Sequence, residues 1–181
     1  MARLSPLALR LGLATLVVVA IYLTSRPAGS AAASLAIGDR APEFLAADRS
    51  TPILLGLDGR PIFLADLGGR PLWIVFWATW CTPCQQEAAS IRAEYHEHAD
   101  VIGVLAIDVL EPAGAVRDYA LAHGLDYPIA LDRTGAAMTL YRAGGLPSHV
   151  FLDGHGRLVD RYAGQLTAAL MAEHLMALTG R

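Results

Sequence analysis

Little of the sequence is charged, and none of its basic residues is lysine. Charged residues make up 17% of the 181 residues, all 14 basic residues are arginine, and the formal net charge is −3. The chain therefore has no basic run or basic face that could bind a phosphate backbone, which excludes nucleic acid as a partner. Hydrophobic residues make up 54% of the chain, which is too apolar for a disordered protein and sufficient for a packed core.

Cysteine is nearly absent as well, because Cys81 and Cys84, in the stretch WATWCTPCQQE, are the only two. A disulfide between them closes so short a loop that it would add little stability, which argues against a structural staple. Haem attachment requires a histidine directly after the second cysteine, where this chain has Gln85. Residues two apart on a helix point in nearly opposite directions, so His96 and His98 could not complete a zinc site, and no metal ligands are assigned.

The N-terminal segment contains a long apolar run without charges. Residues 11–25 carry no charge, follow Arg3 and Arg10, and precede the small residues of 27–36. The run is shorter than the ~20 residues that usually span a bilayer, but apolar flanking residues and a snorkelling arginine make a short anchor feasible. We therefore expect a membrane anchor in residues 1–26 and a linker after it, with a cleaved signal peptide as the alternative.

The positive charges near the N-terminus predict on which side of the membrane the domain lies. Arg3 and Arg10 precede the apolar run, which favours an N-terminus in the cytoplasm and a domain beyond the membrane. We predict a bacterial inner-membrane protein with its domain in the periplasm, or a soluble periplasmic protein if the segment is cleaved. Paired thiols tend to oxidise in such a compartment.

Residues 37–181 read as one domain that begins with a β-hairpin. Short strands are predicted near 53–55 and 62–64, on either side of an Asp-Gly pair that is a strong turn signal. The continuous apolar run PLWIVFW, 71–77, is typical of a strand that is buried on both faces of a sheet. This strand is expected at the centre of the domain.

Helices and strands are predicted to alternate after the central strand. The expected elements are a helix over 81–98, a strand over 101–107, a helix between Pro112 and Gly124, a strand over 127–131, a helix over 135–142, a final hairpin of 148–153 and 157–164, and a helix over 166–178. The pattern predicts an α/β fold with a mixed central sheet flanked by helices. Its first two main strands run in parallel, and its last two form an antiparallel hairpin.

The position of Cys81 predicts a nucleophile. The buried strand turns straight into a helix at Trp80, so Cys81 lies at a helix N-terminus, where free N–H groups and the helix dipole stabilise a thiolate. Pro83 suits the first helical turn because its missing N–H would have no partner there. Cys84, one turn further along, would resolve a mixed disulfide formed by Cys81. The pair would serve as a redox-active disulfide without any bound cofactor.

Two other functions remain open from the chemistry of the thiols alone. A single thiolate of low pKa can reduce peroxide, so Cys81 could belong to a thiol peroxidase. Two neighbouring thiols can also bind copper(I), so the chain could be a metal carrier.

The residues around the pair resemble a known family. IGDRAPEF (37–44), LDGRPIFLADLGGRPLWIVFWATWCTPC (57–84), Glu87 and GGLPSHVFLD (144–153) are similar to the TlpA-like branch of the exported thioredoxins, which includes ResA and the thioredoxins of cytochrome c maturation. The resemblance extends from residue 37 to the C-terminus. It implies the thioredoxin fold and the activity of a membrane-anchored thiol-disulfide oxidoreductase.

The resemblance also implies a substrate site. The peptide bond between Leu146 and Pro147 would be cis and would lie beside the cysteine pair, where the loop backbone receives an extended substrate segment. Trp80 would flank the substrate groove, with Thr82 and Pro83 between the two thiols. These residues are therefore the predicted substrate-binding residues.

Glu87 is the predicted acid of the site. It follows Cys84 by three residues and so lies on the same face of the helix, where a partly buried carboxyl could accept the proton of the resolving thiol. The alternative is that an acid in the first turns of a helix merely interacts with the dipole. Val75 stands where thioredoxin has a buried aspartate, which leaves Glu87 as the main proton acceptor. His149, near the site, is interpreted as structural.

The resemblance implies a reductant of protein disulfides. The C-x-x-C-H segments of apocytochromes c are a candidate substrate, and a membrane thiol-reductant transporter would return the electrons. An oxidant that forms disulfides is the nearest alternative, because the pair Thr82-Pro83 between the cysteines does not determine the redox direction.

Overall fold

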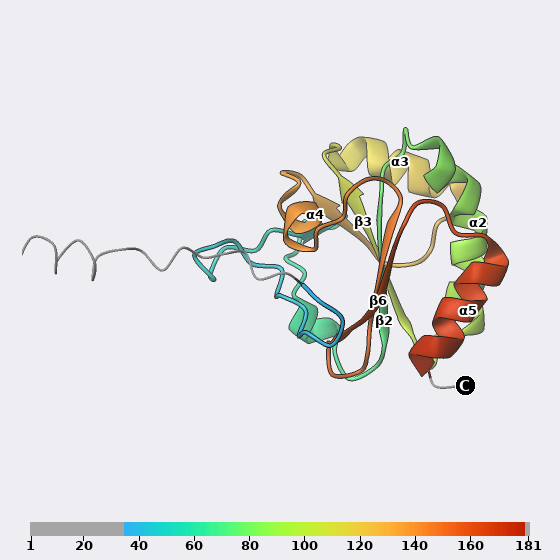
Figure 1. Ribbon diagram of the computed structural model, residues 1–181. Coiled ribbons are helices and arrows are strands. Elements are labelled where there is room, and N and C mark those ends of the chain that lie inside the picture. Colours follow the sequence, from blue (N-terminus) through green and yellow to red (C-terminus); the bar gives the residue numbers. More distant parts are fainter. Residues whose placement is uncertain (1–34, 180–181) are drawn as a thin grey trace, which may run out of the picture. The chain divides into compact units, whose positions relative to one another are not determined.

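A six-stranded mixed sheet forms the centre of the computed structural model, which describes residues 35–179 (Figure 1). Its strands lie in the order β1-β4-β3-β2-β5-β6, and β2, β3 and β4 run in parallel. The strands are β1 (Leu55–Gly56), β2 (Leu72–Trp77), β3 (Gly103–Val109), β4 (Ile129–Asp132), β5 (Ser148–Leu152) and β6 (Leu158–Ala163). The mixed sheet of the predicted α/β fold is confirmed.

The predicted membrane anchor, 1–26, and most of the linker, 27–36, lie outside the described residues. Among the residues that are described, no helix is both long enough and apolar enough to cross a membrane.

Strand β2 is central because both of its faces are covered. Side chains of Trp73, Val75 and Trp77 pack with residues of α2 (Thr82–Glu97), α3 (Ala113–His123) and α5 (Ala168–Thr179). Its alternate side chains pack on the other face, with α4 (Ala136–Leu140) and the segment before β1. Figure 1 shows α2 and α5 on one side of the sheet and α4 on the other. The continuous apolar run of the sequence thus corresponds to a strand that is buried on both faces, as predicted.

The helix ends follow the local signals of the sequence. Pro112 is the N-cap of α3, and Gly124 is its C-cap with a φ of 63°, a left-handed conformation that favours glycine. Cys81 caps α2 at its N-terminus, and Pro83 lies in its first turn. The prolines and glycines of the chain therefore predict these boundaries correctly.

The predicted N-terminal hairpin is only partly formed. Its turn is present, because the N–H of Gly56 donates to the carbonyl of Arg60 at 2.8 Å and Leu55 forms an isolated bridge with Pro61. The predicted strand over 62–64 is wrong, since Leu64 begins the 3-10 helix η1 (Leu64–Leu67). Strand β1 pairs with β4 instead.

Glu43 gives a physical reason for this difference. Its carboxylate accepts hydrogen bonds from the backbone N–H groups of Leu64 and, at 3.0 Å, Ala65. A side-chain acceptor that binds these groups competes with a strand ladder, and Pro61 has no N–H to give to one. The contact spans 21 residues along the chain, so the local hairpin signal contains no trace of it.

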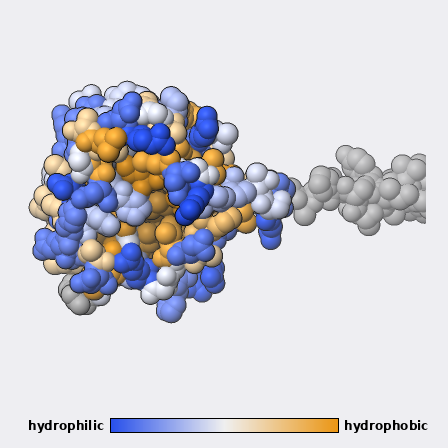
Figure 2. All heavy atoms as spheres, turned by 180° about the vertical axis from the view of Figure 1, so that it is seen from behind, coloured by the Kyte–Doolittle hydropathy of each residue, from blue (hydrophilic) through white to orange (hydrophobic). Residues whose placement is uncertain are grey.

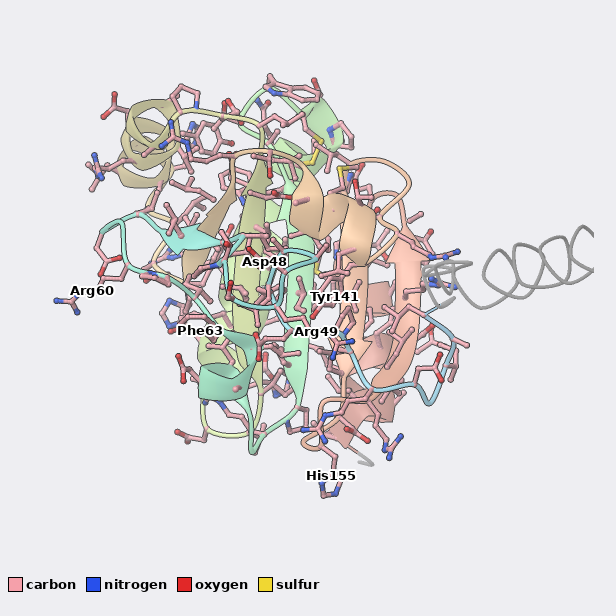
Figure 3. All side chains as sticks on the ribbon, turned by 90° about the vertical axis from the view of Figure 1, so that its left-hand side faces the viewer. Asp48, Arg49, Arg60, Phe63, Tyr141 and His155 are labelled. Carbon is pink, nitrogen blue, oxygen red and sulfur yellow. A yellow bond between two sulfur atoms is a disulfide. The ribbon has the colours of Figure 1, made fainter. Side chains whose placement is uncertain are left out.

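Exposed apolar side chains gather on parts of the surface. Figure 2 shows them on the face turned away from the viewer of Figure 1, with hydrophilic residues around them. The large exposed apolar residues are Ile37, Trp80, Leu110, Leu121, Tyr162 and Met176. By contrast, Arg60 and His155 extend outward from loop tips, which is consistent with solvated side chains (Figure 3).

Tyr141 ties the segment before β1 to the sheet (Figure 3). It is fully buried, and its hydroxyl donates a hydrogen bond to the carbonyl of Pro42 at 2.7 Å. Its ring stacks on Phe44 with centroids 5.3 Å apart and lies 6.0 Å from Phe76 of β2. Burial raises the pKa of Tyr141, so the hydroxyl remains a donor over the physiological range.

We expect Tyr141→Phe to lower the free energy of unfolding by about 1–2 kcal/mol, because it leaves the buried carbonyl of Pro42 without its donor. Urea unfolding followed by tryptophan fluorescence measures this loss. Tyr119→Phe is the matched control, since the hydroxyl of Tyr119 has no hydrogen bond to a described residue. Equal stabilities of the two variants would contradict the assigned role of Tyr141.

Candidate active site

Cys81 and Cys84 form a disulfide at the N-terminus of α2. Their Cα atoms are 5.2 Å apart, and the sulfur of Cys81 accepts the N–H of Cys84 at 3.3 Å. The two residues are only 5% and 3% exposed. A thiolate at Cys81 would therefore receive a backbone hydrogen bond and the positive end of the helix dipole, both of which stabilise it.

An apolar groove of about 450 Å³ opens beside the disulfide. Its lining residues are Trp80, Cys81, Thr82, Pro83, Val109, Leu110, Met138, Gly145 and Leu146. Trp80 and Leu110 are among the most exposed large apolar side chains, at 67% and 64%. The groove thus combines a reactive sulfur with exposed apolar walls, which are typical of a site that binds a ligand.

The structure brings the predicted substrate-binding residues together. Trp80, Thr82, Pro83 and Leu146 line the groove, and Pro147 is buried next to it. The peptide bond between Leu146 and Pro147 is cis, as the resemblance implies.

Three groove residues, Val109, Leu110 and Met138, do not stand out in the sequence. Val109 ends β3, the parallel neighbour of β2, and Leu110 follows it with a φ of 66°. The signal that could have found the first two is the predicted parallel pairing, because the carboxyl ends of adjacent parallel strands lie at the same edge of a sheet. Met138 comes from α4 and carries no such signal.

Glu111 clamps the turn between β2 and α2. Its two carboxylate oxygens accept the backbone N–H and the hydroxyl of Thr79, each at 2.6 Å. The side-chain amide of Gln85 donates to the carbonyl of Thr79, also at 2.6 Å. The backbone N–H, the hydroxyl and the carbonyl of Thr79 thus all form hydrogen bonds. These bonds fix the position of the backbone two residues before Cys81.

Asp108 lies close to this clamp, at a position paired with Trp77 in the β2–β3 ladder. It is fully buried, and neither of its carboxylate oxygens has a hydrogen-bond partner among the described residues. Burial raises the pKa of Asp108 to about 8, and the nearby carboxyl group of Glu111, with a smaller effect of Asp132, acts in the same direction. Asp108 therefore holds a proton at neutral pH.

Glu87 lies inside the domain, three residues after Cys84 in α2. One carboxylate oxygen, Oε2, accepts the backbone N–H of Leu166 at 2.9 Å. The other, Oε1, lies 3.5 Å from Nε2 of His149 and has no hydrogen bond within the described residues. The sequence predicted a partly buried carboxyl, whereas this one is fully covered.

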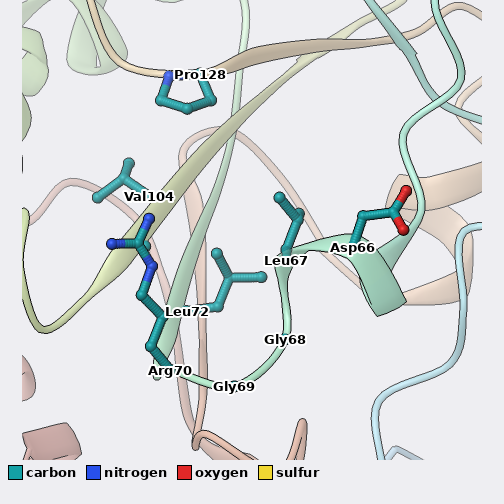
Figure 4. A pocket seen from close by; sticks show the side chains of 9 residues that line it. Asp66, Leu67, Gly68, Gly69, Arg70, Leu72, Val104 and Pro128 are labelled. Atoms are coloured by element: carbon teal, nitrogen blue, oxygen red, sulfur yellow. The ribbon is translucent and has the colours of Figure 1, made fainter.

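A second hollow, of about 370 Å³, lies at the far end of β2 (Figure 4). It is lined by the Gly68-Gly69 break, Arg70 and the first residue of the strand, Leu72. The guanidinium of Arg70 donates to the carbonyl of Ala99 at 2.7 Å. Because the disulfide follows the opposite end of β2, this hollow is separate from the active site.

A thioredoxin-like sheet, a disulfide at the start of a helix and a cis-proline loop beside it together define a thiol-disulfide oxidoreductase. Residues 37–161 match the model of the AhpC/TSA family, and the chain belongs to that family.

Relatives of known activity support this class. The thiol-disulfide oxidoreductase ResA of Bacillus thuringiensis (strain Al Hakam) is 30% identical over 144 residues, which cover 79% of each chain. ResA of Bacillus subtilis (strain 168) is 27% identical over 143 residues, or 78% of this chain and 75% of that protein. The protein is thus an oxidoreductase of the ResA type, as the sequence predicts.

Solved structures agree on the fold. A Chlorobium tepidum protein assigned as the thiol:disulfide interchange protein DsbE superposes with a TM-score of 0.69 at 28% identity, over 80% of this chain and 99% of that one. The exposed lipoprotein thioredoxin Etrx1 of Streptococcus pneumoniae strain TIGR4 gives a TM-score of 0.58 at 27% identity, over 69% and 97% of the two chains. The predicted thioredoxin fold is confirmed.

We expect Asp108→Asn to remove a pH dependence of stability. Folding raises the pKa of Asp108 from 3.8 to about 8, so the folded state binds the proton more tightly than the unfolded state. The free energy of unfolding of the native protein therefore falls as pH rises between about 4 and 8, by up to ~1.4 kcal/mol per pH unit from this group. The variant lacks this loss and gains stability relative to the native protein as pH rises.

Urea unfolding at pH 5, 6, 7 and 8 measures the difference between the two proteins. Asp100→Asn, which changes an exposed carboxyl, is the control and should track the native protein at every pH. A constant difference between native protein and Asp108→Asn across this range would show that Asp108 is ionised in the folded state.

Proposed function

We propose that this protein reduces protein disulfides outside the cytoplasm, through a mixed disulfide at Cys81 that Cys84 resolves. The observation that carries the proposal is the unequal placement of the two sulfurs. Both residues are buried in the core, but only Cys81 lines the apolar groove, and Cys84 does not. A substrate sulfur that enters the groove can reach only the first cysteine.

The reaction needs two thiols in the starting protein. The thiolate of Cys81 attacks one sulfur of the substrate disulfide, and the other substrate sulfur leaves as a thiolate. Cys84 then gives up its proton and attacks the sulfur of Cys81, which closes the protein disulfide and releases the second substrate thiolate. The substrate gains two electrons, and the protein is left oxidised, as in the present structure.

The resemblance implies an extended substrate segment, and the apolar lining of the groove favours an apolar side chain beside the substrate cysteine. Trp80 and Leu110 stand on the walls, and Gly145 and Leu146 bring the loop backbone to the edge. The C-x-x-C-H segments of apocytochromes c are our candidate substrate, on the basis of the resemblance to the cytochrome c maturation thioredoxins.

We further propose that residues 1–26 anchor the protein in the bacterial inner membrane, with the domain in the periplasm and a membrane thiol-reductant transporter as its electron donor. The uncharged run over 11–25 and the arginines before it support this location. Mass spectrometry of the membrane fraction tests it: an intact N-terminus supports the anchor, and a start near residue 30 supports the cleaved signal peptide.

The reduction potential of the Cys81–Cys84 pair distinguishes a reductant from an oxidant. We expect a value near that of thioredoxin, about −270 mV, read from the fluorescence of neighbouring Trp77 and Trp80 across thiol buffers. A value near about −120 mV would make the protein an oxidant and would end the cytochrome c hypothesis.

Trapping the intermediate tests the roles of the two cysteines. Cys84→Ser should accumulate a mixed disulfide with substrate proteins, whereas Cys81→Ser should form none. Peroxide consumption without any disulfide substrate would favour the peroxidase, and stoichiometric copper(I) binding without disulfide reduction would favour the carrier.

We expect Leu110→Ala to raise the KM for a peptide disulfide with an apolar residue next to its cysteine by about fivefold. Loss of a contact of this size costs ~1 kcal/mol of binding, and kcat should change little because the sulfurs are untouched. Leu121→Ala is the matched control, since Leu121 is 76% exposed on α3 and does not line the groove. Equal KM values for the two variants would exclude the groove as the substrate site.

A further inference from the structure

Three buried polar side chains meet beside the active-site helix: Trp73 on β2, His149 on β5 and Glu87 on α2. The indole Nε1 of Trp73 donates to Nδ1 of His149 at 3.3 Å. Nε2 of His149 lies 3.5 Å from Oε1 of Glu87 and 3.2 Å from the carbonyl oxygen of Gly164. The arrangement links the sheet to the helix that carries both cysteines.

Trp73 determines which tautomer His149 adopts. An indole N–H is only a donor, so Nδ1 of His149 must be the acceptor, and the proton of the neutral imidazole lies on Nε2. A second proton on Nδ1 would bring two N–H donors face to face. The contact with Trp73 therefore favours a neutral imidazole whose single N–H points toward Gly164 and Glu87.

This N–H has two acceptors in reach, which allows Glu87 to change its charge. When Glu87 is ionised, the N–H dipole lies 3.5 Å from Oε1 and favours the negative charge. When Oε1 holds a proton, the carbonyl of Gly164, at 3.2 Å, still satisfies the N–H. The imidazole N–H therefore keeps an acceptor in both states, and the loss of that acceptor would cost about 1–3 kcal/mol.

The two oxygens of Glu87 have different roles in this arrangement. Oε2 is held by the backbone N–H of Leu166 at 2.9 Å, which fixes the orientation of the carboxyl. Oε1 has no hydrogen bond within the described residues and is the oxygen that is free to take a proton. Cys84 lies three residues earlier in α2, a spacing that places its side chain and that of Glu87 on the same face of the helix.

We propose that His149 is a positioning residue, which holds Oε1 of Glu87 ready to take the proton of Cys84. The proposal rests on the function proposed above. In the resolving step the S–H bond of Cys84 breaks and its proton passes to Oε1. The electron pair left on Cys84 forms the bond to the sulfur of Cys81, and the bond from Cys81 to the substrate breaks. The substrate leaves as a thiolate.

Few other charged groups surround the pair. Among the described residues, Cys84 shares the helix face of Glu87, Tyr127 interacts electrostatically with Glu87, and the ring of Tyr162 lies 6.4 Å from that of His149. Asp160 and His174 contact each other, and His174 stacks on Phe151, so they belong to a neighbouring group. Burial raises the pKa of Tyr127 and the charge of Glu87 adds to the effect, so this phenol stays neutral. Within the described part of the chain, His149 is the only side chain with a basic nitrogen within 4.0 Å of the carboxyl of Glu87.

The test follows the rate at which Cys84 resolves a mixed disulfide, as a function of pH. Glutathione disulfide serves as the probe: Cys81 of the reduced full chain takes up one glutathione, and stopped-flow fluorescence follows the second step between pH 5 and 9. We expect Glu87→Gln to slow this step by about 100-fold at pH 6, in line with the loss of a proton acceptor.

The rate of the resolving step is expected to fall at low pH, and we call this part of the profile the acidic limb. Two variants should move the acidic limb in opposite directions. His149→Leu removes the N–H dipole that favours the carboxylate, so we expect a rate about tenfold lower at pH 6 and a limb at higher pH. Trp73→Phe keeps an aromatic ring but frees Nδ1, so the imidazole can take a second proton and favour the carboxylate, which moves the limb to lower pH. His149→Gln retains an N–H donor and should restore most of the native rate.

The outcomes separate the two proposals. An unchanged profile in Glu87→Gln would overturn the role of Glu87 and the role of His149 with it. A second outcome is that Glu87→Gln loses the acidic limb, whereas His149→Leu and Trp73→Phe leave it in place or move it in the same direction. His149 is then merely structural, and its proposed role fails while the proposed function of the protein stands. If His149→Leu does not fold, Trp73→Phe provides the test. An acidic limb that stays at the native pH in Trp73→Phe would overturn the proposal. His155→Leu, at an exposed loop tip, should match the native protein throughout.

Discussion

The active site depends on the complete burial of strand β2. All six of its side chains are covered, and it has a neighbouring strand on each edge. Such a strand cannot slip by one residue without turning its side chains to the wrong face, so its end at Trp77 is fixed. Helix α2 begins five residues later, and its free N–H groups therefore meet Cys81. The buried packing of β2 thus determines where α2 begins, and so places the sulfur of Cys81 at the helix N-terminus.

Three carboxyl groups close to this strand end show how one domain can tune similar side chains differently. Buried charge is costly unless it is paired or hydrogen-bonded. Glu111 accepts two hydrogen bonds from Thr79, whereas Asp108, which has no donor, keeps its proton at neutral pH. Glu87 shares its two oxygens between a backbone N–H and an imidazole. The surroundings, and not the chemistry of the carboxyl itself, assign each group its role.

The sequence predicts well what local physics determines. The apolar run of β2, the cap at Cys81 and the proline and glycine at the ends of α3 each act within a few residues, and all lie where they were expected. The failures have long-range causes. Glu43 reaches η1 across 21 residues, and Leu110 enters the groove only because β3 ends beside β2. The contact between His149 and Glu87 joins a strand to a helix, so no local pattern of the sequence shows it.

Glu87 lies on the helix and its partner His149 on the sheet, which has a consequence for the proposed resolving step. Thioredoxin places an aspartate where this chain has Val75, and Val75 is the direct partner of His149 in the β2–β5 ladder. A carboxyl on the sheet changes its distance to Cys84 whenever α2 shifts against the sheet. Glu87 moves with α2, so its distance to that thiol is kept, and the contacts with the imidazole and with the N–H of Leu166 have to adapt. In the proposed resolving step the proton acceptor thus stays with the thiol, while the sheet contributes the dipole of an imidazole N–H.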